Sequence, residues 1–556
     1  MNRKQEVDVE ERKRMYNENE QKILSHFFTN IDKNVYCATD NMPMELWALL
    51  LGGYSRSSES MRDRFLQVFK DISNEADEDV TYDDLIQQLV SDLGESSNTI
   101  KKALQKASNF MSKWAVNYGH NSLKDNCFNM IAIEQVSIKA SKVLEDSKQG
   151  AFQEKSTRYM DFSGDSISEY ANDSEGRPLL EEAMTTYDEI KNALVEYYKT
   201  KINREDFKTE GAWIRTCNAK TFDDARYLLP TSVKTSLGVT MTTRETERWI
   251  SKLLSHSLKE IRDLGERIKN ECVQITPSLI KHISENKFLN RDNSKLFEKL
   301  GEFDSTINKI IAQDELGVSL LEVSDIEIQV AHALIISSGL WDEDHLLNTV
   351  NGHTLDEVYN LIFEDRGPHD DFPQETAVGM LHFDIVCDIG AFRDIQRHRV
   401  GTQIIEKWNA FRGYAIPNVF EDETLAELKT KYISILDKVS EYNKKITNEN
   451  NVNSEYYLLL GHNVRFTYYC DFKQFAYLVE LRSGESGHYS YRKIAQDMYK
   501  LFEEKFPTLA KYIRVNMAGY TDRRAAEEKI EEKIQNNLKI KVDITKPSKD
   551  GFTQIK

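Results

Sequence analysis

The apolar positions near the C-terminal end of the chain follow the period of an α-helix. Between residues 488 and 506, Ile494, Met498, Leu501 and Phe502 stand at i, i+4, i+7 and i+8, so they form one stripe that predicts a buried helix face. Long stretches of the chain carry similar spacing, and only 24 glycines and 9 prolines occur among the 556 residues. The pattern therefore predicts a helix-rich protein with some strands.

Two further predicted helices carry arginines. Asp471 and Arg482 are eleven residues apart, almost a whole number of helical turns, so they share a face that is otherwise apolar. An arginine on such a face must meet a carboxylate, a phosphate or water. Upstream, Arg244 and Arg248 stand at i and i+4, so both side chains would point into one space.

Three pairs of segments indicate that the chain contains two copies of one module. Segment 35–58 resembles segment 318–339, because each predicts a short strand, a turn and an amphipathic helix that ends in small residues. Two later pairs follow in the same order, namely 151–162 with 402–417 and 242–268 with 470–502. Three pairs in one order are harder to attribute to chance than one.

The predicted modules span residues 35–300 and 315–520, joined by a linker over 301–314. A charged, helical arm over 1–34 precedes them, and a charged tail over 521–556 follows. Charged runs of this kind usually form solvated surface, and a contact between subunits is the alternative.

Composition and charge restrict the partners of the protein. Lys and Arg number 73 against 91 Asp and Glu, so the net charge is −18. A chain this acidic is a poor candidate for a nucleic-acid binder, and any anionic ligand must be held by a local cluster of arginines and lysines.

Cellular location and metal binding are also restricted. No run approaches the ~20 apolar residues of a membrane helix, and the charged start of the chain does not resemble a secretory signal. The six cysteines are scattered without a CxxC pair, which predicts reduced thiols in the cytoplasm and no metal site.

The densest basic cluster is the segment RDIQRHR, in which Arg397 and Arg399 bracket His398 shortly before Gly401. The planar guanidinium groups suit phosphate, and their charge can stabilise electron density on a bound heterocycle. A surface patch of ion pairs is the alternative for this segment taken alone.

Three other groups of residues could bind a nucleotide. Ser156 and Arg158 stand beside Tyr159 in a predicted loop, where they can donate to phosphate or form only local hydrogen bonds. Arg226 begins the segment RYLLP, in which an arginine enters an apolar stretch. Arg482 belongs to the segment ELR on the predicted helix described above.

Taken together, these residues resemble the flavin-dependent thymidylate synthases. The resemblance rests on the motifs RHR, S-x-R-Y, R-x-x-L-P and L-R-x-x-x-x-(A/G)-(Q/H)-x-x-x-R, which occur as two incomplete copies. The segment GHNSLKDN at 119–126 also looks like a G-H-x-S-x-x-E-H segment of that family, with Asp125 and Asn126 in place of Glu and His.

The resemblance implies an α/β fold of the α+β kind, with two tandem domains that each hold a small antiparallel sheet flanked by long helices. It implies methylation of dUMP to dTMP with FAD, methylenetetrahydrofolate and NADPH, and no protein nucleophile. Family members are homotetramers, in which one subunit contributes RHR and the L-R arginine, and another contributes S-x-R-Y and R-x-x-L-P.

The losses in the two modules are complementary. The first module has Asp146, Ser147 and Lys148 at the RHR positions, and the acidic Asp146 should disfavour flavin and phosphate there. The second module has Glu455 at the position of the R-x-x-L-P arginine, and Arg412 is separated from Tyr414 in its S-x-R-Y region. Each module thus retains the face that the other lost, which predicts one composite site per chain and a homodimer that imitates the tetramer.

The resemblance assigns roles to the retained residues. The residues expected to bind dUMP are Ser156, Arg158, Arg226 and Arg482. The residues expected to contact FAD are Arg397, His398, Arg399 and Arg244. The expected catalytic residues are Arg397, His398, Arg399 and Arg482.

Two other functions stay open at this point. One is a flavin- and folate-dependent modification of a different pyrimidine nucleotide, because the separation of Arg412 from Tyr414 could reshape the base pocket. The other is a non-catalytic, nucleotide-binding scaffold descended from the synthase.

Overall fold

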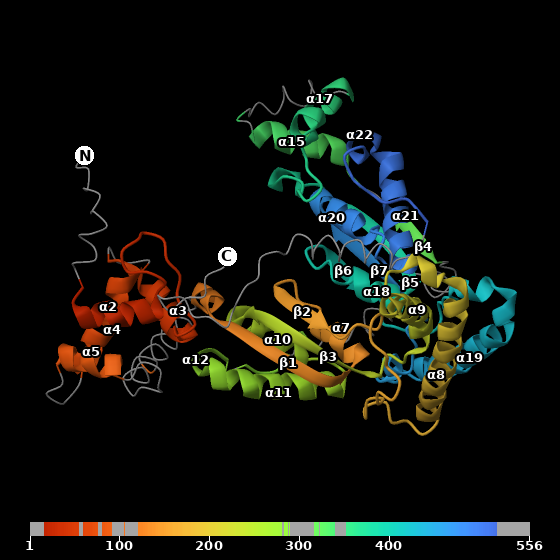
Figure 1. Cartoon of the computed structure of the whole chain (residues 1–556), viewed down its shortest axis with the longest axis horizontal. Coiled ribbons are helices and arrows are strands. Elements are labelled where there is room, and N and C mark those ends of the chain that lie inside the picture. The colour runs from red at the N-terminus through yellow and green to blue at the C-terminus, as the bar shows by residue number, and fades with distance from the viewer. Residues whose placement is uncertain are drawn as a thin grey trace. The chain divides into compact units, whose positions relative to one another are not determined.

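In the structure, a computed structural model, the chain divides into two compact units (Figure 1). The first unit comprises Met1–Ile133, Gln149–Gln153 and Leu237–Arg291, and the second comprises Glu134–Lys148, Glu154–Ser236 and Asp292–Lys556. The residues that the structure describes are 16–54, 59–75, 81–91, 105, 121–280, 283–286, 288–289, 316–321, 323–337, 339 and 352–519.

The predicted linker over 301–314, the predicted tail over 521–556 and residues 1–15 of the predicted arm lie outside the described residues. The module boundaries at 35–300 and 315–520 stay a prediction.

Four helices of the first unit share one hydrophobic core. They are α2 (Glu18–Phe27), α3 (Met44–Tyr54), α4 (Met61–Glu75) and α5 (Tyr82–Ser91). In this core the ring centroid of Phe65 lies 4.9 Å from that of Phe27 and 5.1 Å from that of Phe69. Helix α2 begins with a capping box of Asn17 and Glu20, which satisfies amide groups that a helix start leaves without partners.

The remaining helices of the first unit form a second group, in which α10 (Thr243–Leu254) contacts the other three. They are the 3₁₀-helix η2 (Asn121–Asn126) and the helices α10 (Thr243–Leu254), α11 (Lys259–Ile275) and α12 (Pro277–Ile280). Helix α10 packs on α11 through its buried apolar face, and Thr242 caps its N-terminus.

A three-stranded sheet has the strand order β1-β3-β2. Its strands are β1 (Phe128–Ser137), β3 (Lys234–Thr242) and β2 (Gly150–Glu154), and the boundary between the two units falls within each of them.

The second unit contains a four-stranded antiparallel sheet with the order β4-β5-β7-β6. Its strands are β4 (Gly317–Leu320), β5 (Leu381–Asp388), β7 (Asn463–Cys470) and β6 (Thr402–Ile405). In the central pair, Leu381 lies opposite Cys470 and Asp388 lies opposite Asn463. This register places Asp388, the last residue of β5, at the beginning of β7.

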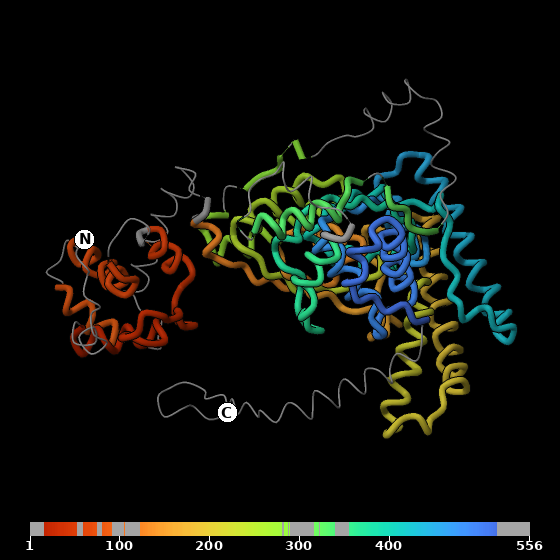
Figure 2. The backbone as a smooth tube through the Cα atoms, turned by 90° about the horizontal axis from the view of Figure 1, so that it is seen from above, coloured from red at the N-terminus to blue at the C-terminus, as the bar shows by residue number. Residues whose placement is uncertain are grey.

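Helices cover the sheet and extend from it. The ring of Phe475 stacks on that of Phe383 of β5, and its centroid lies 4.6 Å from that of Phe502. Two consecutive helices, α20 (Phe472–Arg482) and α21 (Tyr489–Lys505), therefore share the core on this side of the sheet. Helix α8 (Gly176–Lys201), the longest in the described ranges, packs against both α9 (Glu210–Ala225) and α19 (Ala426–Asn448) (Figures 1 and 2).

The helices of the second unit follow in chain order. They are α7 (Ile138–Leu144), α8 (Gly176–Lys201), α9 (Glu210–Ala225), α15 (Ile326–Ser337), α17 (Gly352–Phe363), α18 (Ile389–Ile395), α19 (Ala426–Asn448), α20 (Phe472–Arg482), α21 (Tyr489–Lys505) and α22 (Pro507–Ala510). The 3₁₀-helices are η3 (Arg204–Asp206), η4 (Arg226–Leu228), η5 (Gln374–Thr376), η6 (Asn418–Glu421), η7 (Glu423–Leu425) and η8 (Ser454–Tyr456).

One order of elements occurs twice along the chain. The series β1, α7, β2, α8, η4, β3, α10, α11 and α12 is repeated as β5, α18, β6, α19, η8, β7, α20, α21 and α22, apart from η3 and α9 in the first copy and η6 and η7 in the second. The strand orders β1-β3-β2 and β5-β7-β6 also match. The predicted fold class, α/β with two small antiparallel sheets and many helices, is therefore confirmed.

The helices predicted from spacing are also present. In α21, Ile494, Met498 and Phe502 of the predicted stripe are buried, and Leu501 is half-buried. Asp471 is the N-cap of α20, where its side chain accepts from the amide of Gln474 at 2.8 Å, and Arg482 is the last residue of this helix.

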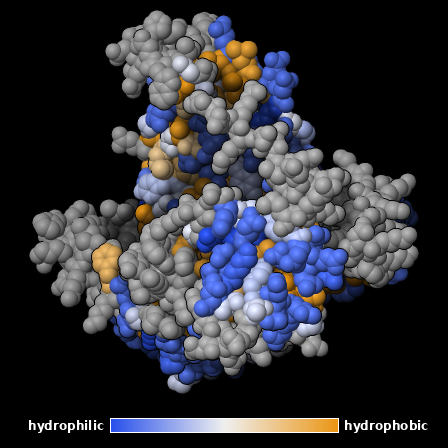
Figure 3. Space-filling model, turned by 90° about the vertical axis from the view of Figure 1, so that its left-hand side faces the viewer, coloured by the Kyte–Doolittle hydropathy of each residue, from blue (hydrophilic) through white to orange (hydrophobic). Residues whose placement is uncertain are grey.

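One face of the surface is mostly polar. On the face in Figure 3, the coloured atoms are mostly hydrophilic, and hydrophobic atoms form small separate areas. None of the helices in the described ranges is both long enough and apolar enough to cross a bilayer. The described residues also include no group of three or more His, Cys, Asp or Glu side chains that could hold a metal ion.

Candidate functional site

Helix α18 positions the RDIQRHR segment within the second unit. Asp388 at the end of β5 caps this helix, since its Oδ1 accepts from the amide of Ala391 at 2.7 Å, and its Oδ2 accepts from the hydroxyl of Ser490. The helix is seven residues long, so Arg393 and Asp394 lie in its last turn and Arg397 to Arg399 follow its end.

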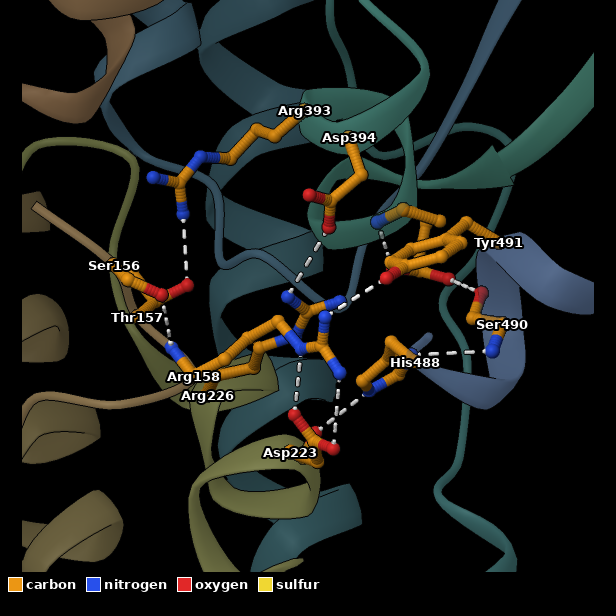
Figure 4. Close-up of polar contacts among 12 residues, drawn as sticks. Ser156, Thr157, Arg158, Asp223, Arg226, Arg393, Asp394, His488, Ser490 and Tyr491 are labelled. Carbon is orange, nitrogen blue, oxygen red and sulfur yellow. Dashed lines mark hydrogen bonds and ion pairs between the residues drawn. The ribbon is translucent and has the colours of Figure 1, made fainter. Parts of the chain in front are cut away.

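A buried ionic network joins α18 to the loop after β2. Glu154 lies 3.0 Å from Arg393 and 2.9 Å from Lys142. Burial by itself would raise the pKa of the Glu154 carboxyl, but Arg393 and Lys142 outweigh that effect and lower it to about 2. Arg393 also donates to the hydroxyl of Thr157 at 3.1 Å, which fixes the loop beside the helix (Figure 4).

Arg158 is buried between three segments of the chain (Figure 4). Its Nε donates to Asp223 at 2.8 Å, its Nη1 donates to the hydroxyl of Tyr491 at 2.9 Å, and its Nη2 donates to the carbonyl of Ser486 at 3.3 Å. Most of its donors are therefore used within the protein. Ser156, two residues earlier, accepts from the amide of Arg158 at 3.3 Å.

Arg226 is one of the most deeply buried side chains, with 2% of its surface exposed. Pairing of the segments around Tyr227 and Gly461 positions it, since the amide of Gly461 donates to the carbonyl of Tyr227 at 2.8 Å. Its Nη1 lies 3.7 Å from Asp394, and its Nε and Nη2 have no hydrogen-bond partner among the described residues. Buried donors without partners are rare, which makes Arg226 a candidate to hold a ligand.

Asp394 faces several arginines. Besides its contact with Arg226, its Oδ1 lies 3.9 Å from Nη1 of Arg397. Burial would raise the pKa of this carboxyl, but Arg226, Arg397, Arg158 and Arg482 together hold it well below its usual range. Asp394 is therefore a buried anion that these four cations share.

Arg482 and His398 form a direct pair, because Nε of Arg482 donates to Nε2 of His398 at 2.8 Å. Burial and the neighbouring arginines, with Arg482 first, lower the pKa of His398 to about 3, so its ring is neutral at physiological pH. Since Nε2 accepts a hydrogen bond, the ring proton is on Nδ1. Gln474, whose side-chain amide lies 3.3 Å from Nδ1, should then present its oxygen to this proton.

Tyr491 lies between two of these arginines. The guanidinium carbons of Arg158 and Arg482 are 5.4 Å and 5.5 Å from the centre of its ring. Both distances are within the range of cation–π attraction, so Tyr491 helps to hold two like charges near each other.

The remaining RHR arginines are more accessible. The side chain of Arg397 is 43% exposed, and Arg399 is half-buried. Burial lowers the pKa of Arg399, and Arg397 lowers it further, whereas Glu145 and Asp146 act in the opposite direction. Asp146, which stands at the lost RHR position of the first copy, is thus an electrostatic neighbour of the retained motif.

A cavity lies near each end of α18. One of about 720 Å³ is lined by Asp388, Ser490 and Tyr227. Another of about 450 Å³ is lined by Gln474 and Tyr477, which both lie against His398, and by Val400. Neither cavity is lined by Arg158, Arg226, Arg397 or Arg482, which together are called the arginine cluster.

In the first copy, the position that corresponds to Gly390 of α18 is occupied by a lysine that forms an ion pair. Counted from the helix caps Ser137 and Asp388, Lys139 of α7 corresponds to Gly390 of α18. Nζ of Lys139 lies 2.6 Å from Glu455 and 4.3 Å from the ring centre of Trp408. Gly390 instead lies against Arg226, because a Cβ built on it would be 3.2 Å from Nη2 of that arginine.

The structure brings together seven of the eight predicted site residues in the second unit, as members or neighbours of the arginine cluster. They are Ser156, Arg158, Arg226, Arg397, His398, Arg399 and Arg482. Arg244 belongs to the first unit, where it pairs with Asp125 at 2.9 Å. The sequence did not single out Asp223, Asp394 or Tyr491, although Asp394 is part of the RDIQRHR segment.

Comparison with known proteins gives the family of the chain. The family model described as thymidylate synthase complementing protein matches residues 74–278 and 369–508, which is more than half of the chain and falls in two segments. The chain belongs to this family. Membership identifies it as a methyltransferase-like enzyme of the flavin-dependent thymidylate synthase type.

Two curated relatives extend the comparison. A protein named UPF0159 from Chlamydia muridarum (strain MoPn / Nigg) is 26% identical over 540 residues, which cover 91% of this chain and 96% of the relative. A flavin-dependent thymidylate synthase from Clostridium tetani (strain Massachusetts / E88) is 24% identical over 205 residues, which cover 35% of this chain and 75% of that enzyme.

Among solved structures, the UMP/dUMP methylase PolB from Streptomyces cacaoi, bound with 5-Br dUMP, is 12% identical. The match covers 36% of this chain and 95% of PolB, with a TM-score of 0.29. A TM-score this low supports no inference about this member of the family.

Proposed function

We propose that the chain methylates dUMP to dTMP, with FAD as cofactor and with methylenetetrahydrofolate and NADPH as co-substrates, at one composite site. The observation that carries this proposal is the convergence of the complementary motifs. Arg158 and Arg226 from the first copy lie with Asp394, Arg397 and Arg482 from the second copy within one unit. Motifs that had decayed independently would have no reason to meet.

The phosphate of dUMP would bind at Arg226 and Arg482. Arg226 offers two buried donors, Nε and Nη2, that have no partner among the described residues. Arg482 is held by His398, so its guanidinium group is already oriented. A charge-assisted contact between arginine and phosphate contributes roughly 1.5–3 kcal/mol, so the loss of one such contact should weaken binding about 10- to 100-fold.

Ser156 and Arg158 would bind dUMP less directly than Arg226. Arg158 already pairs with Asp223 at 2.8 Å, so its first contribution is to keep the loop after β2 beside the cluster. The hydroxyl of Ser156, on the same loop, would then donate to the nucleotide from a fixed position.

The residues near His398 fit the ring of a flavin. The cavity of about 450 Å³ beside this imidazole is lined by the aromatic side chain of Tyr477 and by Val400. Charged residues of both signs also line it, namely Asp371, Asp471, Glu480, Arg366 and Lys473. Arg397 and Arg399 would stabilise the anionic form of the reduced ring.

When bound, FAD would supply the chemistry that carries the one-carbon unit. In the net reaction, methylenetetrahydrofolate gives its methylene group to C5 of uracil, the C5 hydrogen leaves as a proton, and a hydride from NADPH completes the methyl group. The chain itself would orient the uracil, exclude water and supply positive charge, since the proposed mechanism uses no protein nucleophile.

The pair of Glu455 and Lys139 occupies the positions that correspond to Arg226 and Gly390, and we expect no nucleotide to bind there. Glu455 replaces the phosphate-binding arginine there, and its ion pair with Lys139 is buried. One chain would therefore hold one site, and we propose a homodimer with two sites. Arg244 of the first unit would contact FAD, a role that stays a prediction.

A tritium-release assay tests the proposed function. The purified full chain should release tritium from [5-³H]dUMP only when methylenetetrahydrofolate and NADPH are both present, and it should carry the visible absorbance of flavin. Arg399→Ala should remove the flavin absorbance, and Arg226→Ala should weaken dUMP binding about 10- to 100-fold. Glu455→Gln is the control for a buried charged residue outside the site.

The outcomes separate the alternatives. A yellow protein that releases tritium only from another pyrimidine nucleotide would support a different substrate. A colourless protein that binds dUMP without tritium release would support a scaffold and refute the proposed function.

A further inference from the structure

Asp394 occupies an unusual position for a carboxylate at a proposed phosphate site. It is 7% exposed and lies in the last turn of α18, where it faces the arginine cluster (Figure 4). The four arginines come from four separate segments of the second unit: the loop after β2, η4, the segment after α18, and the end of α20. A dense group of cations therefore surrounds one internal anion.

The contacts of Asp394 are electrostatic more than hydrogen-bonding. Its oxygens lie 3.7 Å from Arg226 and 3.9 Å from Arg397, and both distances exceed that of a hydrogen bond. Asp394 therefore compensates positive charge, while Nε and Nη2 of Arg226 stay without a partner among the described residues. A ligand could use these donors without breaking a hydrogen bond of Asp394.

The charges of the arginines and of their acidic neighbours indicate which ligand charge the cluster can accept. The arginine cluster carries four positive charges, Asp223 pairs with Arg158, and Asp394 compensates a second charge. Positive charges still outnumber the negative ones around the cluster, so it can accept an anionic ligand. Asp388, which caps the N-terminus of α18, also faces Arg226: burial raises the pKa of its carboxyl, and Arg226 acts in the opposite direction.

We propose that Asp394 sets the charge of the ligand that the arginine cluster accepts, so that a nucleoside monophosphate binds in preference to a nucleoside diphosphate. This inference rests on the proposed function, because it assumes that the arginine cluster is the phosphate site. A diphosphate brings at least one further negative charge close to Asp394, and the repulsion lowers its affinity. Without Asp394, the same arginines would attract the more highly charged nucleotide.

The test is a comparison of dUMP and dUDP affinities, measured by isothermal titration calorimetry on the full chain. In Asp394→Asn the affinity ratio of dUDP to dUMP should rise about tenfold over that of the wild type, the effect of one nearby charge that solvent partly screens. In Asp394→Glu, which keeps the charge, the ratio should stay within about twofold of the wild type. In Arg397→Gln, which removes a positive charge at an exposed position, the ratio should fall.

The ratio of two affinities in one variant does not depend on the fraction of protein that is folded, so a purely structural role of Asp394 would not move it. If both nucleotides bind and the ratio is unchanged in Asp394→Asn and Arg397→Gln, the inference is wrong while the proposed phosphate site stands. If neither nucleotide binds to any of the proteins, the proposed site and the inference both fail.

Discussion

The ion pair between Arg158 and Asp223 should be one of the strongest couplings in the second unit. Nε of Arg158 lies 2.8 Å from Oδ1 of Asp223, and the two side chains are 10% and 2% exposed. We consider Asp223→Asn, Arg158→Met and the double variant. Asp223→Asn leaves a buried guanidinium without its carboxylate, and Arg158→Met leaves a buried carboxylate without its cation.

The expected loss in the free energy of unfolding follows from the burial of both side chains. The loss of one partner from a buried ion pair costs about 3–5 kcal/mol, because the remaining charge is neither solvated nor compensated. Arg158 keeps its contacts with Tyr491 and Ser486 in Asp223→Asn, which places the expected cost near the lower end, about 3 kcal/mol. The double variant has no buried charge at this position, so it should cost about 2 kcal/mol less than the sum of the single variants.

Native-state hydrogen exchange is the appropriate assay, because two units need not unfold in a single transition. Amides of α9, which carries Asp223, and of α21, which carries Tyr491, report on the same unit at both sides of the pair. Protection in both helices should fall together in each single variant and recover in part in the double variant. Strictly additive costs, or a loss of protection confined to α9, would refute the reasoning.

Two further predictions concern pH and the second copy. Stability should fall with acid because the pKa of His398 is lowered to about 3: the unfolded chain gains a proton below pH ~6.5 that the native state does not take up. Between pH 6.5 and 5, the free energy of opening measured by hydrogen exchange of α20 amides should therefore fall by about 2 kcal/mol more in the wild type than in His398→Gln, and equal losses would contradict this assignment. Glu455→Gln should cost about 3–5 kcal/mol by leaving Lys139 unpaired, yet leave dUMP affinity in calorimetry unchanged; a tenfold loss of affinity would show that the second copy contributes to the site.

Local spacing was sufficient to predict several elements. The stripe of Ile494, Met498 and Phe502 gave a helix whose buried side the structure confirms in α21. The helix predicted between Asp471 and Arg482 is also present, with Asp471 as the N-cap of α20 and Arg482 as its last residue. These features depend on residues a few turns apart, whose geometry the helix period determines.

The partners of the site residues could not be predicted in the same way. Arg158 and Asp223 are 65 positions apart, and Arg158 and Tyr491 are 333 positions apart, so only the tertiary fold brings them together. An arginine on an apolar face was expected to meet a carboxylate, a phosphate or water, yet Arg482 meets the neutral ring of His398. A histidine becomes such an acceptor only when burial and nearby cations keep it unprotonated, and a sequence pattern does not report burial.

The two copies differ in charge at corresponding positions, and this difference explains why the motif residues lost from one copy are not lost at random. At one position Gly390 leaves room for Arg226, whose Nη2 would lie 3.2 Å from any Cβ placed there. At the equivalent position Lys139 fills the space, and Glu455 supplies the opposite charge at 2.6 Å. A glycine opposite Glu455 would leave a buried carboxylate unpaired, and a lysine opposite Arg226 would bring two buried cations together. Each pair is therefore most stable as a unit, and the copy with Gly390 keeps both the space and the cation that the proposed phosphate site needs.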